Sequence, residues 1–252
     1  MRVFVITGAG ISAESGIPTF RGKDGYWRNL DPTKLATPEA FSADPVLVWE
    51  WYEERRKRIR LAQPNPAHLA VVKLCAQTRD FLLVTQNVDD LHTRAEWQGY
   101  RLSKDKIVQI HGDIFVTRCS RCAYNYPEPS AETPGAISFE QPGDLPRCPE
   151  CQALMRPGVV WFGEQLAAAE VERVERFLKR GPCDLALVIG TTAIFPYIID
   201  WTIRARGKEG DLVEVNPVDT PLTPWATDLV REAAGQALPS IVNRYLAAGD
   251  PC

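Results

Sequence analysis

Short apolar runs rich in branched side chains recur along the chain, and each of them is closed by a turn signal. Such runs are typical of strands that are buried on both faces of a sheet. Segments with a helical spacing of apolar residues lie between some of them, and this alternation predicts an α/β fold with a parallel sheet covered by helices on both faces. The expected strands are Val3–Thr7, Phe81–Thr85, Ile107–Ile110, Leu185–Ile189 and Leu212–Val215, and the expected helices include Pro66–Ala76 and Ala168–Lys179.

A cluster of glycine or polar residues follows each expected strand. In open α/β sheets, ligands bind outside the carboxyl ends of the strands. Five clusters that end at one edge therefore predict a single binding site there. They are Gly8-Ala9-Gly10, Gln86-Asn87-Val88-Asp89, His111-Gly112, Gly190-Thr191-Thr192 and Asn216-Pro217.

Two segments do not share this alternation. Residues 19–65 lack a clear strand and contain one strong helix, from Asp44 to about Ala62, and residues 114–156 hold two pairs of cysteines. We predict that they form a smaller lobe, the first as a helical insertion and the second as a metal-binding module. The remaining segments are 1–18, 66–113 and 157–252, and we expect them to form a Rossmann-like domain.

The loop after the first strand matches the dinucleotide-binding pattern G-x-G-x-x-G/A. In that pattern Gly8 permits the tight turn, Gly10 lets the backbone approach a pyrophosphate, and Ala13 takes the third position for close packing. The motif alone is weak, and an ordinary glycine turn is the alternative. The segment Glu14–Gly22 is too rich in glycine and proline for a long helix, and the acid that dehydrogenases carry on a second strand is missing. A hydride-transfer enzyme is therefore disfavoured, and we expect the loop to fold over the cofactor.

Four of the seven cysteines form two C-x-x-C pairs separated by 25 residues. Four thiolates in two chelating hairpins suit one tetrahedral Zn²⁺, and a full set of protein ligands makes that zinc structural. A redox pair and a zinc ribbon that binds nucleic acid are the alternatives, although nearby acidic residues offset the basic ones. The ligands would be Cys119, Cys122, Cys148 and Cys151, whereas Cys75 and Cys183 lie beside apolar runs and are expected in the core.

The overall composition narrows the possible partners. The 252 residues are 45% hydrophobic and carry a formal net charge of −3, which argues against a nucleic-acid partner that depends on global basicity. The chain shows no apolar stretch long enough for a signal peptide or a membrane span. We therefore expect a cytoplasmic protein that binds neither nucleic acid nor a membrane, and we expect it to be a monomer.

The helix that opens with Asp44-Pro45 has an N-cap residue and a first-turn proline. Its inward stripe is expected to contain Val48, Tyr52 and Ile59, and Arg55 lies on the same face, three residues after Tyr52. A guanidinium on an apolar stripe needs an anionic partner or a route to solvent. Spacing alone leaves two hypotheses open: a buried anion-binding arginine, or a snorkelling arginine in the basic run 55–58, which is otherwise a solvated face.

Several segments together resemble the sirtuin family. They are GAGISAESGIPTFRG (Gly8–Gly22), TQNVDDLH (Thr85–His92), His111-Gly112, RPGVVWFGE (Arg156–Glu164) and the two cysteine pairs, in the order typical of the family and spanning residues 8 to about 240. The resemblance implies an NAD-dependent protein deacylase that acts on acyl-lysine in proteins or peptides, consumes NAD as a co-substrate and holds one structural Zn²⁺. An ADP-ribosyltransferase with the same cofactor pocket, or a zinc-ribbon interaction module with a non-catalytic nucleotide site, would be the alternatives.

The resemblance also assigns the cofactor site residue by residue. Gln86 and Asn87 would contact the ribose, beside Val88, and Asp89 would hold the nicotinamide carboxamide. Residues that would line the rest of the nicotinamide half are Gly8, Ala9, Gly10, Ser12, Ala13, Thr19, Phe20, Arg21, Tyr26 and Trp27. The phosphates and the adenosine half would lie against Gly190, Thr191, Thr192, Asn216, Pro217, Val218 and Ala237. Thr192 replaces the usual serine and keeps a hydroxyl, and Pro196 comes about one residue earlier than in the family pattern.

The chemistry implied by the resemblance places His111 as the catalytic base, with Asn87 beside the reacting ribose. The acyl-lysine carbonyl oxygen attacks C1′ of the nicotinamide ribose, nicotinamide leaves, and the products are free lysine and O-acyl-ADP-ribose. Histidine suits the role because its ordinary pKa of about 6.5 keeps it partly neutral near pH 7. The alternative for His111 is packing at a strand end; His68 is expected to cap or pack, and His92 to be structural.

The acyl group is also suggested by the resemblance. Tyr52-Glu53-Glu54-Arg55 is similar to the Y-x-x-R signature of a bacterial subgroup that removes succinyl and malonyl groups, in which the tyrosine and arginine bind the distal carboxylate. Ala36 would leave room for such a chain, and Val159, Val160, Trp161, Phe162 and Gly163 would contact the substrate. We therefore expect succinyl groups to be removed faster than acetyl groups.

Overall fold

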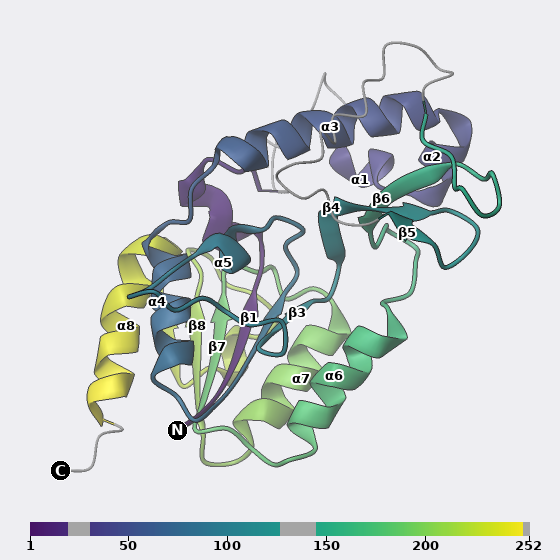
Figure 1. Ribbon diagram of the computed structural model, residues 1–252. Helices are drawn as coiled ribbons and strands as arrows, with labels where there is room; N and C mark the ends of the chain where they lie inside the picture. Colours follow the sequence, from purple (N-terminus) through teal and green to yellow (C-terminus); the bar gives the residue numbers. More distant parts are fainter. Residues whose placement is uncertain (20–30, 127–144, 249–252) are drawn as a thin grey trace. The chain divides into compact units, whose positions relative to one another are not determined.

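The computed structural model describes residues 1–19, 31–126 and 145–248. The chain divides into two units, which Figure 1 shows with the sequence running from purple to yellow. The first unit comprises Met1–Thr19, Ala62–Ile110 and Ala167–Cys252, and the second comprises Phe20–Leu61 and His111–Leu166.

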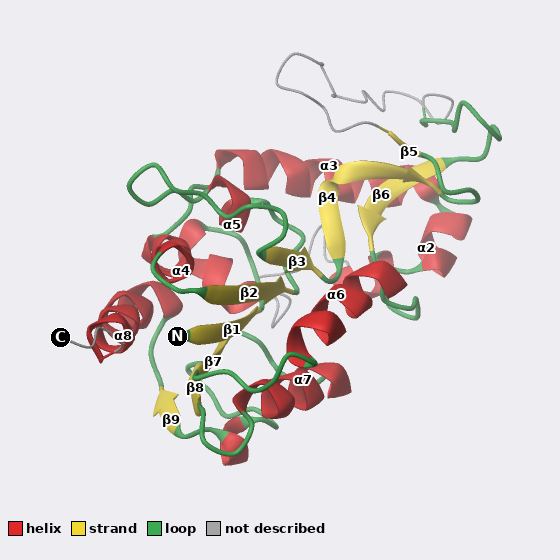
Figure 2. Ribbon diagram, turned by 60° about the horizontal axis from the view of Figure 1, so that its bottom comes forward, coloured by secondary structure: helices red, strands yellow, loops and turns green. Residues whose placement is uncertain are grey.

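A six-stranded parallel sheet forms the centre of the first unit (Figure 2). Its order is β3-β2-β1-β7-β8-β9, which within this unit is the 3-2-1-4-5-6 order of the dinucleotide-binding fold, with its switch point between β1 and β7. All five predicted strands are confirmed, and β9 was missed because its three residues are only partly buried and show no apolar run. The bounds are β1 (Arg2–Thr7), β2 (Asp80–Thr85), β3 (Ile107–Gln109), β7 (Leu185–Ile189), β8 (Asp211–Val215) and β9 (Asp228–Val230).

Helices cover both faces of this sheet, as predicted. On one face lie α4 (Pro66–Ala76) and α8 (Ala234–Ala248), and on the other α6 (Ala168–Leu178) and α7 (Pro196–Arg206) (Figure 1). Alternate residues of each central strand pack on opposite layers; on the α6 side, the ring of Phe4 stacks on that of Phe177 at 6.0 Å. Because both faces are covered, the central strands are mostly apolar, which explains the apolar runs in the sequence. Shorter elements of this unit are η1 (Ala9–Ser15), α5 (Leu91–Arg94) and η4 (Thr223–Trp225).

The start of α4 is fixed by a capping box. The Asn65 side chain accepts a hydrogen bond from the Ala67 N–H, and Nδ1 of His68 accepts one from the Asn65 N–H at 3.3 Å. Pro66 fills the first turn, where no N–H is needed. The capping role predicted for His68 is confirmed.

In its described residues, the second unit combines three α-helices with a small antiparallel sheet. The sheet order is β5-β4-β6, and α3 packs against β4 and β6, with the Trp49 indole donating to the Met155 carbonyl at 3.0 Å. The predicted helix from Asp44 is confirmed as α3, whose first turn is capped by the Asp44 carboxylate accepting from the Leu47 N–H at 2.9 Å. The bounds are α1 (Pro32–Leu35), α2 (Pro38–Ala43), α3 (Pro45–Leu61), β4 (Gly112–Cys119), β5 (Asn125–Tyr126) and β6 (Met155–Val159).

The basic run on α3 is not a solvated face at every position. Arg56 is 2% exposed, forms an ion pair with Glu53 at 2.7 Å and donates to the carbonyl of Ile114 at 2.6 Å and to that of Val116 at 3.2 Å. The pairing of β4 with β6 is irregular between Gly112 and Thr117, which leaves these carbonyls available to a side chain. The prediction of a solvated run is therefore wrong at Arg56, which joins the helix to β4.

The division into units differs from the predicted boundaries by a few residues at most junctions and by ten at one of them. The third Rossmann-like segment was predicted from residue 157, whereas the first unit resumes at Ala167, because β6 pairs with β4 and continues the second unit. His111 likewise falls in the second unit, directly after Ile110. Among the described residues, no helix is both long and apolar enough to cross a membrane.

Candidate active site

Loops from four parallel strands meet at the carboxyl edge of the first unit. The Gly10 N–H donates to the Gly190 carbonyl at 2.8 Å, across the switch point between β1 and β7. Gln86 Nε2 donates to Thr191 Oγ1 at 2.8 Å, and Asn216 Nδ2 donates to the Thr191 carbonyl at 2.5 Å. The predicted convergence of these clusters is confirmed for the four that belong to the first unit.

The glycines of the first loop allow two backbones to pack against each other. A Cβ on Gly10 would lie 2.6 Å from Cα of Gly190, and one on Gly8 would lie 2.8 Å from the Gly190 carbonyl oxygen. Gly190 itself has φ of +59°, a left-handed conformation that favours glycine. The glycines of the G-x-G motif therefore allow the loops after β1 and β7 to pack closely, in addition to the approach to a pyrophosphate that the motif predicts. Ala13, by contrast, is exposed on the 3₁₀ helix η1, so the close packing predicted for it does not occur.

Asn87 and Asp89 are held by a buried serine. Asn87 Nδ2 donates to Ser12 Oγ at 3.0 Å, and Ser12 Oγ donates to Asp89 Oδ2 at 3.0 Å. His68 Nε2 approaches the same hydroxyl at 3.5 Å. A hydroxyl has one donor and two acceptor positions, so Ser12 is fully used by protein side chains. The arrangement fixes the amide of Asn87 and the carboxylate of Asp89 at the end of β2.

Two neutral histidines lie beneath this network. The rings of His68 and His92 meet edge to face at 4.8 Å, and His92 Nε2 lies 3.1 Å from Thr7 Oγ1. Burial lowers the pKa of His68 to about 4, with a smaller contribution from the positive charge of Arg94, and burial lowers the pKa of His92 well below its ordinary value. Both rings are therefore uncharged near neutral pH, which agrees with the structural role predicted for His92.

The loop after β8 is organised by an acid that sequence reasoning missed. Glu214 is 1% exposed and accepts hydrogen bonds from Thr220 Oγ1 at 2.5 Å and from Thr223 Oγ1 at 2.6 Å. These contacts tie residues 216–223, including the predicted contacts Pro217 and Val218, to the end of the strand. The signal was present, because Glu214 interrupts the apolar part of β8, from Leu212 to Val215.

The start of α8 is tied to the first loop. The Glu14 carboxylate accepts a hydrogen bond from the Gly235 N–H at 2.5 Å, at the amino end of this helix, where a negative charge is favourable. Ala237 is buried in the same turn.

His111 begins the second unit. Its side chain is half-buried, and its carbonyl accepts a hydrogen bond from the Val160 N–H at 2.8 Å, which joins the start of β4 to the segment after β6. Val159 ends β6, and Phe162 and Gly163 are exposed on the turn that follows.

The residues predicted to bind the acyl chain come together within the second unit. The Phe162 N–H donates to the Ala36 carbonyl at 2.9 Å, and the Trp161 Nε1–H donates to the Tyr52 hydroxyl at 2.9 Å. Arg55 places its guanidinium carbon 4.8 Å from the Trp51 ring centroid and 5.8 Å from that of Tyr52. Tyr52 is fully buried, as predicted for the α3 stripe, and burial raises the pKa of its phenol.

The Trp161 indole packs against an ion pair formed by Arg156 and Glu164. The Arg156 guanidinium stacks on this ring at 3.2 Å and binds Glu164 through two hydrogen bonds of 2.5 and 2.9 Å. Glu164 also accepts from the Trp161 backbone N–H at 2.8 Å. Burial is the largest single influence and raises the pKa of the Glu164 carboxyl, but the hydrogen bonds from Arg156 and the Trp161 N–H, together with the positive charges of Arg156 and Arg118, hold the pKa below its ordinary value. Sequence reasoning gave no indication of this pair.

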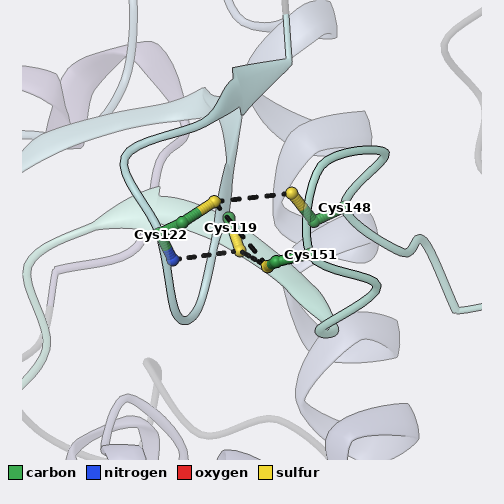
Figure 3. Close-up of side chains that lie close together, drawn as sticks. All are labelled: Cys119, Cys122, Cys148 and Cys151. Carbon is green, nitrogen blue, oxygen red and sulfur yellow. Dashed lines mark hydrogen bonds between the residues drawn. The ribbon is translucent and has the colours of Figure 1, made fainter.

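The two cysteine pairs form one cluster of four sulfur atoms (Figure 3). All four Sγ atoms lie within 4.8 Å of one another, with separations of 3.5 Å for Cys119–Cys151 and for Cys122–Cys148. Ligands about 2.3 Å from a tetrahedral Zn²⁺ lie about 3.8 Å apart, so the spacing fits that ion. Amide N–H groups of Arg121 and Cys122 point at Cys119 Sγ at 3.3 Å, as suits a thiolate. The predicted site for one structural zinc is confirmed. Cys75 and Cys183 are buried, also as predicted.

Four predicted cofactor contacts, Phe20, Arg21, Tyr26 and Trp27, lie outside the described residues. Thr19 is the last described residue before them and is half-buried. Ala9 lies in the segment after β1, Val88 in the loop after β2, and Thr192 follows Thr191 in the loop after β7.

Comparison with known proteins gives consistent matches. The model of the Sir2 family matches residues 8–195. The chain is 43% identical to an NAD-dependent protein deacylase of Thermococcus kodakarensis, over 94% of this chain and 88% of that protein. It is 39% identical to an NAD-dependent protein deacylase of Aquifex aeolicus, over 96% of this chain and 95% of the relative.

Solved structures agree with these sequence matches. A crystal structure of a Sir2 homologue–NAD complex is 40% identical, with a TM-score of 0.81 over 98% of this chain and 90% of that chain. A mutant Sir2 homologue in complex with 2′-O-acetyl ADP-ribose is 38% identical, with a TM-score of 0.82 over 98% of this chain and 92% of that chain.

Proposed function

This chain belongs to the Sir2 family and is an NAD-dependent protein deacylase, and on that premise we propose that it prefers acyl-lysine whose acyl group ends in a carboxylate, such as succinyl-lysine. The family and the curated relatives establish NAD as the co-substrate and acylated protein as the substrate. The family and the relatives do not specify the acyl group, and our proposal for it is based on side chains of the second unit.

The observation that carries the proposal is the hydroxyl of Tyr52. Its oxygen accepts from Trp161, and the described part of the chain offers no acceptor for its hydrogen. A buried donor without a partner costs about 1–3 kcal/mol, so this hydroxyl is suited to a ligand with an acceptor oxygen. Arg55, three residues along the same helix face, supplies a planar fork that matches a carboxylate.

The charge around Tyr52 points the same way. Arg55 and Arg156 both act on the phenol as positive charges. Glu164 acts on it as a negative charge, and Glu164 is neutralised by its pair with Arg156. The surplus positive charge favours an anionic acyl group over a neutral one. Ala36, whose backbone carbonyl accepts from the Phe162 N–H, has a small side chain that is consistent with room for a longer acyl chain.

We assign the base to His111, in keeping with the family motif. Its support within this chain is that the other two histidines are buried and held neutral, His68 in a helix cap and His92 against Thr7. Asn87 and Asp89, fixed through Ser12, would then orient the ribose and the carboxamide of NAD. These groups bind and orient the co-substrate, and the imidazole accepts a ribose hydroxyl proton.

A peptide panel tests the proposal. Matched acetyl-, succinyl- and glutaryl-lysine peptides are incubated with NAD, and kcat/KM is measured from nicotinamide release, with products identified by mass spectrometry. We expect a higher kcat/KM for the acidic acyl groups, O-acyl-ADP-ribose as product, and no deacylation by His111→Ala. A higher value for the acetyl peptide would contradict the acyl preference, and ADP-ribose attached to protein without deacylation would indicate transferase activity instead.

A further inference from the structure

We propose that Trp161 is a positioning residue that sets the acyl preference, by turning the Tyr52 hydroxyl so that its hydrogen points at the acyl carboxylate. The inference rests on the proposed function, because it assumes that Tyr52 binds that carboxylate. It concerns a different group, however, since Trp161 acts through Tyr52 rather than on the carboxylate itself.

The direction of one hydrogen bond carries the inference. The indole Nε1–H lies 2.9 Å from the Tyr52 oxygen, and indole is a donor only. The phenol must therefore accept from Trp161, and its own hydrogen has to point elsewhere. Without the indole N–H, the phenol could rotate, and its hydrogen would no longer be committed to a ligand.

The indole is itself held from several sides. The Arg156 guanidinium carbon lies 3.2 Å from the centroid of the Trp161 ring, and the Phe41 ring centroid lies 5.3 Å from it. Trp161 is only 3% exposed. Glu164 binds both the Arg156 guanidinium and the Trp161 backbone N–H, so ring and backbone are fixed by the same carboxylate. An arrangement this constrained holds the N–H in a single direction.

The phenol is also kept in the form that can donate. Burial raises the pKa of Tyr52, and the positive charges of Arg55 and Arg156 only partly offset that effect. The hydroxyl hence keeps its proton near neutral pH and can donate to an anion.

The test is a double-variant cycle on selectivity. The ratio of kcat/KM for succinyl-lysine to that for acetyl-lysine is measured for the wild type, Trp161→Phe, Tyr52→Phe and the double variant, with zinc content checked in each. Trp161→Phe keeps an aromatic ring but removes the N–H. We expect it to lower the ratio about tenfold in the wild-type background and by less than about twofold in the Tyr52→Phe background.

The result that would overturn the inference is a Trp161→Phe effect of equal size in both backgrounds, or no change in the ratio. Where Trp161→Phe does not fold, site-specific benzothienylalanine at position 161 keeps the ring shape and replaces N–H by sulfur, and the same outcomes apply. Arg55→Met separates the two levels of the proposal. If Arg55→Met leaves the ratio unchanged, the proposed function fails; if it lowers the ratio while the cycle is additive, the positioning role alone fails.

Discussion

At the scale of single residues, the physical environment of each titratable group decides what it can do. His68 and His92 have similar side chains to His111, yet both are enclosed beneath Ser12 and Asp89 and kept neutral, whereas His111 is half-buried. Tyr52 and Glu164 show the same principle. Burial raises the pKa of the Tyr52 phenol, whereas hydrogen bonds and nearby positive charges together hold the pKa of the Glu164 carboxyl below its ordinary value.

The depressed pKa of His68 predicts a loss of stability in acid. The unfolded ring takes up its proton near pH 6.5 and the folded ring only near pH 4, so protons favour the unfolded chain between these values. The stabilisation is complete above about pH 6.5 and falls by about 1.4 kcal/mol for each pH unit down to pH 4.

His68→Gln tests this prediction, because glutamine at this position keeps the capping box. Urea unfolding at pH 7, 6 and 5 should show a shallower pH dependence in the variant than in the wild type, by about one proton. Groups that titrate in both proteins cancel in this comparison. Identical slopes would show that His68 is protonated alike in the folded and unfolded states.

A residue's role could be predicted from the sequence where its partners lie close to it along the chain, and could not where they lie far away. Tyr52 and Arg55 lie three residues apart on one helix, so their common face was predictable, and the cysteine pairs carry their spacing in the sequence. Trp161 and Arg156 contact Tyr52 and each other across the second unit, and no local pattern encodes such a contact. Arg56 was predicted at the surface because a basic run gives no sign of the β4 carbonyls that bury it.

At the scale of secondary structure, the loops after β1 and β7 form one element, because their backbones touch at Gly10 and Gly190. The five predicted strands could be recognised because burial on both faces leaves apolar runs in the sequence. The strands β4, β5 and β6 could not, since they are short or irregular and the zinc site holds their ends together.

Gly10→Ala should destabilise the protein and weaken NAD binding. The new Cβ would lie 2.6 Å from Gly190 Cα, where only backbone can move aside, and overpacking of this kind costs about 1–3 kcal/mol. Gly99→Ala is the matched control, because its Cβ meets no atom within 4 Å and only its φ of +79° is strained. Chemical denaturation and NAD titration by calorimetry measure both effects. NAD affinity that is equal in the two variants would contradict a role for this loop contact in the cofactor site.

At the scale of the whole molecule, the chain joins a six-stranded nucleotide-binding unit to a second unit that carries the four-cysteine cluster and the residues that we propose to bind the acyl group. The cysteine hairpins link β4 to the segment before β6. Without a metal ion, four thiolates at this spacing would repel one another or take up protons. We therefore treat zinc as part of the stability of the second unit.

Removal of the zinc should lower thermal stability. Cys148→Ala is expected to bind less than one zinc per chain by atomic emission and to unfold at a lower temperature, because one tetrahedral ligand is lost. Cys75→Ala removes a buried cysteine outside the cluster and should keep one zinc per chain. A Cys148→Ala protein that retains one equivalent of tightly bound zinc would contradict the four-cysteine site.

The acyl preference is tested most directly by Arg55→Met, measured as kcat/KM on matched succinyl- and acetyl-lysine peptides with NAD. A charged hydrogen bond contributes about 1.5–3 kcal/mol, so we expect the succinyl-to-acetyl ratio to fall about ten- to a hundredfold. Arg55→Lys should fall between the variant and the wild type, because it keeps the charge and loses the planar fork. Equal losses on the two peptides would show that Arg55 does not bind the acyl carboxylate.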